Sequence, residues 1–200
     1  MMMAGGEITP APGPPDPPEP AELIYELESP TTEADYDTEV SLFDEPKSFT
    51  ILCSATFKNY NWTDWTQGVF GTGKGKYFRY GSIQNGNDYS EGAVAATANR
   101  YSAIIMNPGG SGSACSSMHS RDNSTKTRRF AIRYNHRTRK IEGITSSSGT
   151  TTRWWILSSD VSSNNTIKLL VGGATGTINE FKIYSGCLTD TEIGTFIAGT

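Results

Sequence analysis

One stretch decides the fold: Ser48-Phe49-Thr50-Ile51-Leu52-Cys53-Ser54-Ala55-Thr56-Phe57. The odd positions from 49 to 57 are all apolar, and four of the five even positions carry a hydroxyl group. A period of two puts one face of a β-strand in a core and the other near solvent. The stretch therefore predicts a half-buried strand.

Further short segments on both sides read as strands, because each is apolar or β-branched and is bounded by Gly, Asn, Ser or Pro clusters. An edge strand is predicted at Leu23–Leu27, where apolar and acidic residues alternate, followed by a polar turn region. The other predicted strands are Gly68–Thr72, Lys76–Ile83, Tyr101–Met106, Arg129–Tyr134, Arg139–Thr145, Thr152–Leu157, Thr166–Val171 and Thr177–Tyr184. Their close spacing predicts an all-β protein, a two-sheet antiparallel jelly-roll sandwich.

A short helix is predicted at the C-terminal end. Thr189 to Glu192 form a capping box, and Leu188 and Ile193 occupy the positions of a hydrophobic staple. Phe196 and Ile197 would then turn back onto the sandwich.

The N-terminal region differs from the rest in composition. Residues 1–22 include seven prolines between Pro10 and Pro20, which predict an extended polyproline II arm ahead of a domain at 23–200. Residues 1–45 hold twelve acidic and no basic side chains, whereas the remainder holds seventeen basic and nine acidic ones. An acidic arm thus precedes a basic domain, which favours attachment to a partner. The arm is either a flexible tail or an ordered anchor.

The run from Gly176 to Ile193, with Phe181-Lys182-Ile183-Tyr184 and Thr189-Asp190-Thr191-Glu192, resembles the last strand and exit helix of laminin-G-like, concanavalin-type domains. Thr166–Gly173 is similar to the penultimate strand. Tyr36-Asp37-Thr38 is similar to an opening strand, although Glu39 stands where Gly is usual. The resemblance covers both ends of the domain and implies a concanavalin-like sandwich of the kind found in lectins, phage structural proteins and some glycosidases. The segment 58–126 matches nothing specific.

Aromatic residues in polar segments are the candidate sugar contacts. Trp62 and Trp65 stand beside Asn61 and Asp64, and an aromatic face with a polar rim suits the apolar faces and hydroxyl groups of a sugar. Either tryptophan could instead plug the end of the sandwich. Tyr89 and Trp154 are weaker candidates.

Basic residues crowd the region from 121 to 140. Arg129, Arg133 and Arg137 are predicted to share one face of a strand pair and to contact solvent, an anionic glycan or the acidic arm. Nucleic acid is not expected because no aromatic side chains interleave with them. The family resemblance leaves calcium open, with Asp35 and Asp37 as weak candidate ligands and Asp64 as a third.

Other motifs lead to no expected activity. Gly68–Gly75 lacks the Ser or Thr and the following helix of a phosphate-binding loop, and Gly109–Ser113 lacks the setting of a nucleophile elbow. The histidines at 119 and 136 have no regular partner spacing. Cys53, Cys115 and Cys187 read as small apolar residues, with a Cys53–Cys187 bridge left open.

The sequence favours a non-catalytic module that binds host or mucosal glycans. We expect it on a phage virion or another extracellular surface, attached to other proteins through residues 1–22 and present as a homo-oligomer or a multicopy array. No cofactor other than optional calcium is expected. The N-terminal sequence has no signal-peptide pattern, and no membrane segment is expected. A glycoside hydrolase or lyase is the first alternative, although no two acids after residue 45 stand at i and i+2 of a predicted strand. A decoration protein that binds no sugar is the second.

Overall fold

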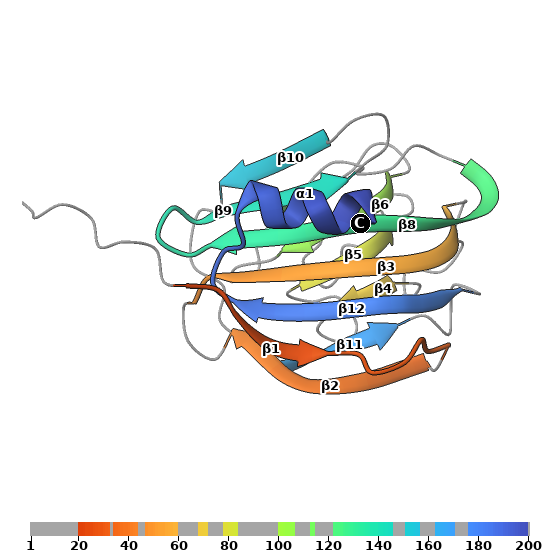
Figure 1. Cartoon of the computed structure of the whole chain (residues 1–200), viewed down its shortest axis with the longest axis horizontal. Helices are drawn as coiled ribbons and strands as arrows, with labels where there is room; N and C mark the ends of the chain where they lie inside the picture. The colour runs from red at the N-terminus through yellow and green to blue at the C-terminus, as the bar shows by residue number, and fades with distance from the viewer. Residues whose placement is uncertain are drawn as a thin grey trace, which may run out of the picture.

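Two antiparallel β-sheets lie face to face in the computed structural model, with one helix on the outer face of the first sheet (Figure 1). The structure describes residues 20–32, 34–43, 47–59, 68–71, 78–83, 100–106, 113–114, 122–145, 151–156, 163–170 and 176–199. In spatial order, sheet A contains β1 (Glu22–Glu26), β12 (Thr177–Ser185), β3 (Phe49–Asn59), β8 (Asp122–Asn135), β9 (Lys140–Thr145) and β10 (Thr151–Ile156). Sheet B contains β2 (Ala34–Phe43), β11 (Ser163–Leu170), β4 (Gly68–Gly71), β5 (Phe78–Ile83), β6 (Arg100–Met106) and β7 (Ser113–Ala114). The helix is α1 (Asp190–Ala198), so the predicted jelly-roll sandwich with a short C-terminal helix is confirmed.

The alternating stretch from Phe49 to Phe57 lies in β3, in the middle of sheet A between β12 and β8. Its odd-numbered residues Phe49, Ile51, Cys53 and Ala55 are buried between the sheets. On the opposite face Leu52 is buried by a second cluster that includes α1. The predicted alternation is therefore correct, and the face expected near solvent is partly covered by the helix.

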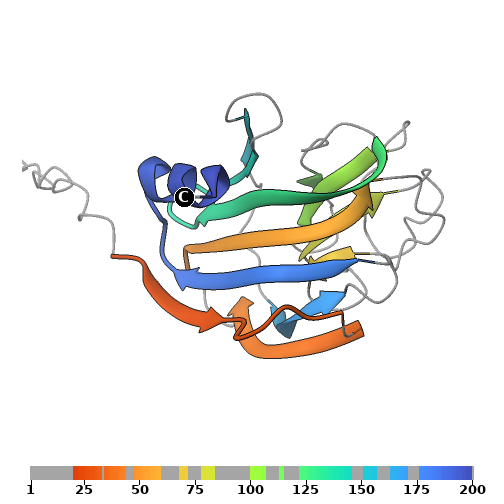
Figure 2. The same ribbon diagram turned by 45° about the vertical axis from the view of Figure 1, so that its right-hand side comes forward.

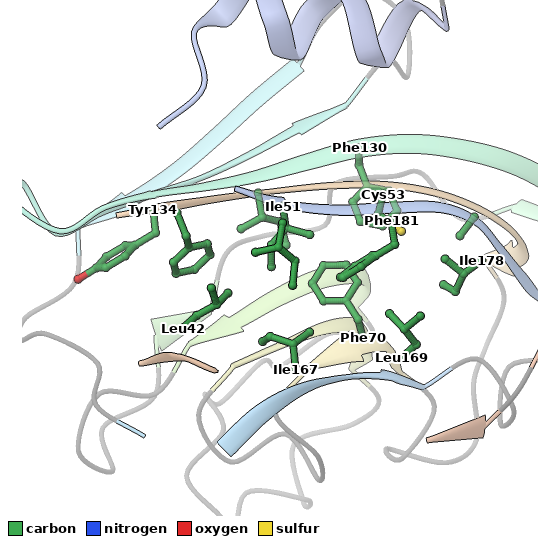
Figure 3. Packing of buried hydrophobic residues seen from close by; sticks show 14 of the residues in the cluster. Leu42, Ile51, Cys53, Phe70, Phe130, Tyr134, Ile167, Leu169, Ile178 and Phe181 are labelled. Carbon is green, nitrogen blue, oxygen red and sulfur yellow. The ribbon is translucent and has the colours of Figure 1, made fainter. Parts of the chain in front are cut away.

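Aromatic side chains join the two sheets at the centre of the core (Figure 3). Phe70 of sheet B stacks on Phe130 of sheet A, with ring centroids 6.1 Å apart, and meets the edge of Phe181 at 5.0 Å. All three rings are fully buried. Because each ring removes a large apolar area from water, this contact is a principal source of cohesion between the sheets.

The predicted edge strand at Leu23–Leu27 is confirmed as β1, which pairs with β12 at the margin of sheet A. A register shift between Leu23 and Tyr25 turns Tyr25 inward against Phe181, with ring centroids 6.3 Å apart. Leu23 and Ile24 keep 48% and 44% of their surface exposed, which makes them the exposed large apolar residues of the described chain.

The predicted polar turn region between residues 28 and 47 is wrong, because ten of its residues form β2, which pairs with β11. Asp37, Glu39 and Ser41 alternate along it with Thr38, Val40 and Leu42, the residues that turn toward the core. Glu39 has a φ of 59°, a left-handed conformation that disfavours residues with a Cβ atom.

No helix in the described ranges is long and apolar enough to cross a membrane.

Candidate functional site

Helix α1 is fixed at its N-terminus by the predicted capping box. The Glu192 backbone N–H donates to Thr189 Oγ1 at 3.3 Å, and the Thr189 N–H donates to Glu192 Oε2 at 2.7 Å. Thr189 donates hydrogen bonds to the Glu192 carboxylate from its hydroxyl and from its backbone N–H. These hydrogen bonds hold the pKa of Glu192 below its ordinary value. Leu188, Ile193, Phe196 and Ile197 are buried against sheet A, so the staple and the returning apolar face are also as predicted.

Two of the three candidate arginines tie this helix to the sheet. Arg133 donates through Nε to Glu142 at 2.8 Å and through a terminal nitrogen to the Leu188 carbonyl at 2.8 Å, and it pairs with Asp190 at 2.8 Å. Burial alone would lower the pKa of Arg133, but its contacts with Glu142 and Asp190 leave the pKa raised. Its guanidinium group thus joins β8, β9 and the start of α1.

Arg129 plays the same part at the other end of the helix. It donates to the Phe196 carbonyl at 3.2 Å, pairs with Glu180 at 3.2 Å, and lies over the Phe196 ring at 5.1 Å from its centroid. Arg137 lies in the turn after β8 and is exposed. The prediction that the three arginines share one face therefore holds for Arg129 and Arg133 and is wrong for Arg137.

A groove of about 390 Å³ runs along the junction between α1 and β12 on the outer face of sheet A. Half-buried Tyr184 supplies aromatic surface, and the nearly buried Phe196, Leu52 and Leu188 form an apolar floor. Helix α1 packs against β8, and Figure 2 shows β12 lower in the same sheet, beyond β3 and not beneath the helix. The volume is in the range of small-molecule and peptide sites, so this groove is the candidate site of the described chain.

Charged side chains form the other wall of the groove. Lys182 pairs with Glu26 at 3.0 Å and with Glu180 at 3.2 Å. The hydrogen bond to Glu26, more than any other cause, raises the pKa of Lys182. The groove also contains Arg129 and Glu192, so cations and anions balance within it. Such a lining suits a neutral or zwitterionic ligand better than a strongly charged one.

The carboxylates of the groove are engaged by the protein's own groups. Glu180 pairs with Arg129 and Lys182, and Glu192 caps α1. A glycosidase needs one carboxyl group to protonate the leaving group and a second to act as nucleophile or base. In this groove the carboxylate of Glu180 instead forms ion pairs, and that of Glu192 caps the helix.

The described cysteines are free thiols, so the Cys53–Cys187 bridge left open by the sequence is not formed. Cys53 lies opposite Phe181 in the β3–β12 register. Phe181 precedes Cys187 by six residues, which corresponds to about 20 Å along a strand. Burial raises the pKa of both thiols, and Glu180 raises that of Cys53 further. Cys53 therefore behaves as a small apolar residue, as predicted, whereas the half-buried Cys187 donates a hydrogen bond through Sγ to the Tyr134 carbonyl at 3.5 Å.

The Nδ1 atom of His136 is buried and has no hydrogen-bond partner in the described chain. The His136 backbone N–H donates to Ser48 Oγ at 3.1 Å, and the same serine is bonded to the Cys187 side chain. Among the described residues, no group of three or more His, Cys, Asp or Glu side chains is placed to hold a metal ion.

The calcium candidates fall in β2. Asp37 accepts hydrogen bonds from the Glu39 N–H at 2.9 Å and from Thr166 Oγ1 at 3.0 Å, so both of its carboxylate oxygens have protein partners. The side chain of Asp35 lies outside the described residues, as does Asp64. Calcium binding stays a prediction.

Most of the candidate sugar contacts, Asn61, Trp62, Asp64, Trp65 and Tyr89, lie outside the described residues. The strands that flank them are described. Gly68, where β4 begins after segment 60–67, pairs with Gly81 of β5, and Ile83 at the end of β5 pairs with Arg100 of β6. Segments 60–67 and 84–99 are thus attached to neighbouring strands at the same end of sheet B.

The Trp154 backbone is placed elsewhere. Trp154 pairs with Glu142 of β9, and Glu142 in turn pairs with Arg133 of β8. Arg133 pairs on its other side with Thr50 of β3. Thr50 is nine residues before Asn59 on β3, which corresponds to about 30 Å along the strand. The register therefore puts Trp154 at the level of the first half of β3, away from the strand end that leads into segment 60–67.

The groove is not predicted from the sequence. Glu180, Lys182 and Tyr184 lie within a predicted strand, where they alternate with Phe181 and Ile183 and so occupy one face. That alternation was a readable signal for an outward-facing polar and aromatic row. The helix wall beside it depends on contacts between distant segments.

No family model matches the chain, and no curated protein matches it. Among solved structures, it is similar to the CBM40 module of the Ruminococcus gnavus IT-sialidase bound to α2,6-sialyllactose, with a TM-score of 0.50 and 11% identity over 88% of this chain and 100% of the module. The likeness is one of fold. The receptor-binding domain of botulinum neurotoxin type G follows with a TM-score of 0.48, 15% identity and coverage of 77% of this chain and 38% of that one. A leech intramolecular trans-sialidase has a TM-score of 0.47 and 15% identity over 90% of this chain and 28% of its own.

Proposed function

We propose that this protein is a non-catalytic carbohydrate-binding and adhesion module. The proposal depends on one observation: the aromatic segments 60–67 and 84–99 are attached to adjacent strand ends of sheet B. This brings the tethers of Trp62 and Trp65 close to that of Tyr89. The carbohydrate-binding module with the same fold, whose structure contains α2,6-sialyllactose, supports the proposal as a precedent.

The chemistry of the segment supports a sugar ligand. Trp62 and Trp65 provide apolar faces for pyranose C–H groups, and Asn61 and Asp64 provide amide and carboxylate partners for sugar hydroxyls. We expect weak binding at a single site of this kind, so multiple copies would be needed for firm attachment.

A glycan array probed with the full chain tests the proposal, followed by titration with α2,6-sialyllactose and with lactose as the uncharged control. Trp62→Ala and Trp65→Ala should each weaken binding of the sugar found by about tenfold, the usual effect of removing an aromatic anchor. Trp154→Ala is the matched control, because its register places it elsewhere. A blank array, or an equal loss in the Trp154 variant, contradicts this location of the site.

We further propose display on a phage virion or another extracellular surface, with residues 1–22 as the attachment element. The contrast between the acidic N-terminal region and the basic remainder supports attachment through the arm, because opposite charges direct association. Deletion of residues 1–20, which leaves Ala21 and β1 in place, should remove the protein from purified particles while leaving its expression unchanged. Normal incorporation of the shortened chain would exclude the arm as the anchor.

A further inference from the structure

We propose that the groove between α1 and β12 receives the proline-rich segment, residues 10–20, of a second copy of this chain. The inference rests on the attachment role proposed for the arm and names a partner for it. It is independent of glycan binding.

The arm has a three-residue pattern that fits one face of a polyproline II helix. Such a helix has three residues per turn, so residues three apart share an edge. Pro12, Pro15 and Pro18 form one edge, and Pro14, Pro17 and Pro20 form a second. Gly13, Asp16 and Glu19 form the third. The predicted helix thus has two ridges of proline rings and one acidic edge.

The groove has the surfaces that such a helix requires. Proline-rich helices dock in grooves lined by aromatic side chains, because the rings pack on proline and the preformed helix loses little entropy on binding. Tyr184 is the half-buried aromatic residue here, and Phe196, Leu52 and Leu188, each at most 9% exposed, form the apolar floor beside it. Proline also lacks an N–H, so the arm offers mainly carbonyl acceptors.

The hydrogen-bond donors of the groove match those acceptors. An ammonium group has three N–H donors, and the two ion pairs of Lys182 within the described chain use two of them. Tyr184 also lines the groove, and a tyrosine hydroxyl can donate to a carbonyl. The stretch of β12 from Glu180 to Tyr184 spans about 13 Å, which accommodates one Pro-x-x-Pro unit of about 9 Å.

The place where the arm enters the domain connects it to this groove. Ala21 packs on the cluster of Leu52, Leu188 and α1, and Glu22 lies opposite Ser185, next to Tyr184. The arm therefore leaves the domain beside one mouth of the groove. A neighbouring copy that approaches this edge brings its own arm to the same place.

Chain direction favours a second copy over the arm's own domain. From Glu22 onward, β1 runs beside β12 in the direction from Ser185 toward Lys182, the direction in which the groove extends. An arm that arrives at Glu22 would have to reverse its course within Pro20 and Ala21 to lie along its own groove. Pro17, Pro18 and Pro20 make this segment stiff over several residues, which opposes such a reversal. Exchange between copies requires no reversal and generates either a closed dimer or an open array.

Sedimentation velocity of the full chain across a micromolar-to-millimolar concentration series tests the proposal. The wild-type chain should associate, and replacing Pro14, Pro15, Pro17 and Pro18 with Ser should weaken association by at least about tenfold, as expected for the loss of anchor side chains. Asp16→Asn with Glu19→Gln should have little effect, because the groove is charge-balanced. Excess synthetic peptide of residues 8–21 should dissociate the wild-type assembly.

Thr195→Arg fills the groove from the helix and should abolish association. Thr191→Arg is the matched control, since Thr191 is exposed on the same helix and does not line the groove. Thermal unfolding of both variants shows whether Thr195→Arg keeps its fold, and the peptide competition decides the matter if it does not. Association that survives the proline changes, or a peptide that fails to compete, overturns the proposal.

Two further outcomes separate this inference from the proposed function. Dissociation of the assembly by lactose or α2,6-sialyllactose would make the groove a sugar site and overturn arm binding. Unchanged glycan binding by the Thr195→Arg variant, together with its lost association, would support both proposals as separate functions of two surfaces.

Discussion

Replacing Arg133 with Met should undock α1 from sheet A. The Nε bond to Glu142 joins side chains that are only 16% and 10% exposed, and such a charge-assisted bond is worth about 1.5–3 kcal/mol. The bond to the Leu188 carbonyl adds about 1 kcal/mol. The pair with Asp190 adds at most about 0.5 kcal/mol, because that carboxylate is 87% exposed.

Glu142 keeps Lys140 as a partner at 2.7 Å, so the substitution does not leave an isolated buried charge. We therefore expect a loss of about 3 kcal/mol in the free energy of unfolding, measured by urea titration. Asp190→Asn should cost no more than about 0.5 kcal/mol, and Arg133→Lys should fall between the two, since an ammonium group cannot reach all three partners.

Hydrogen exchange locates the loss. In the Arg133→Met protein, the amides of Phe196 and Ile197 should exchange faster than in the wild type, while those of β3 keep their relative protection. A cost below about 1 kcal/mol, or equal loss of protection in the helix and in β3, would refute the reasoning that Arg133 acts as a local tie.

Three other predictions address the core, the backbone and the helix cap. Phe70→Ala should destabilise the protein by about 3–5 kcal/mol in urea, because it empties the aromatic contact between the sheets, whereas Phe70→Leu should cost much less. Glu39→Gly should stabilise by up to about 1 kcal/mol through relief of its positive φ, and a decrease in melting temperature would contradict that explanation. Glu192→Gln should destabilise at neutral pH. Because the folded-state pKa of Glu192 is lowered, its contribution to the free energy of unfolding is fully present above the unfolded-state pKa. That contribution is lost as pH falls through the folded-state pKa, so the stabilities of wild type and variant should converge in acid. A constant difference across pH would argue against the cap.

The parts of the fold that local chemistry determines could be predicted from the sequence. The alternation in β3 and the capping box of α1 are each contained in about ten consecutive residues, and both are confirmed. Strand β2 also alternates, but its acidic residues led to the prediction of a polar turn. Acidic side chains are unfavourable in most strands, yet here Asp37 is satisfied by Thr166, a residue 129 positions away. A long-range partner of this kind cannot be read from local propensity.

The arginines show the same limit for the candidate site. A dense basic segment indicates an anionic ligand, but Arg133 and Arg129 find their partners in carbonyls 55 and 67 residues further along the chain. The sequence shows which side chains are charged, but only the fold shows which of them already have partners within the protein. The groove depends in the same way on α1 lying across a sheet assembled from both ends of the domain.

The position of β12 between β1 and β3 has a consequence for synthesis on the ribosome. This strand lies between β1 and β3, whose residues precede it by well over a hundred positions, and it contributes Phe181 and Ile183 to the core. While residues 177–185 are still inside the exit tunnel, β1 has no partner in its sheet and β3 lacks one neighbour. The nascent chain must therefore wait in an incomplete state, with apolar strand surfaces open to other chains, until nearly two hundred residues have emerged. Production of this protein should accordingly depend on chaperones that shield nascent chains, and slower translation upstream of β12 should lengthen that exposure.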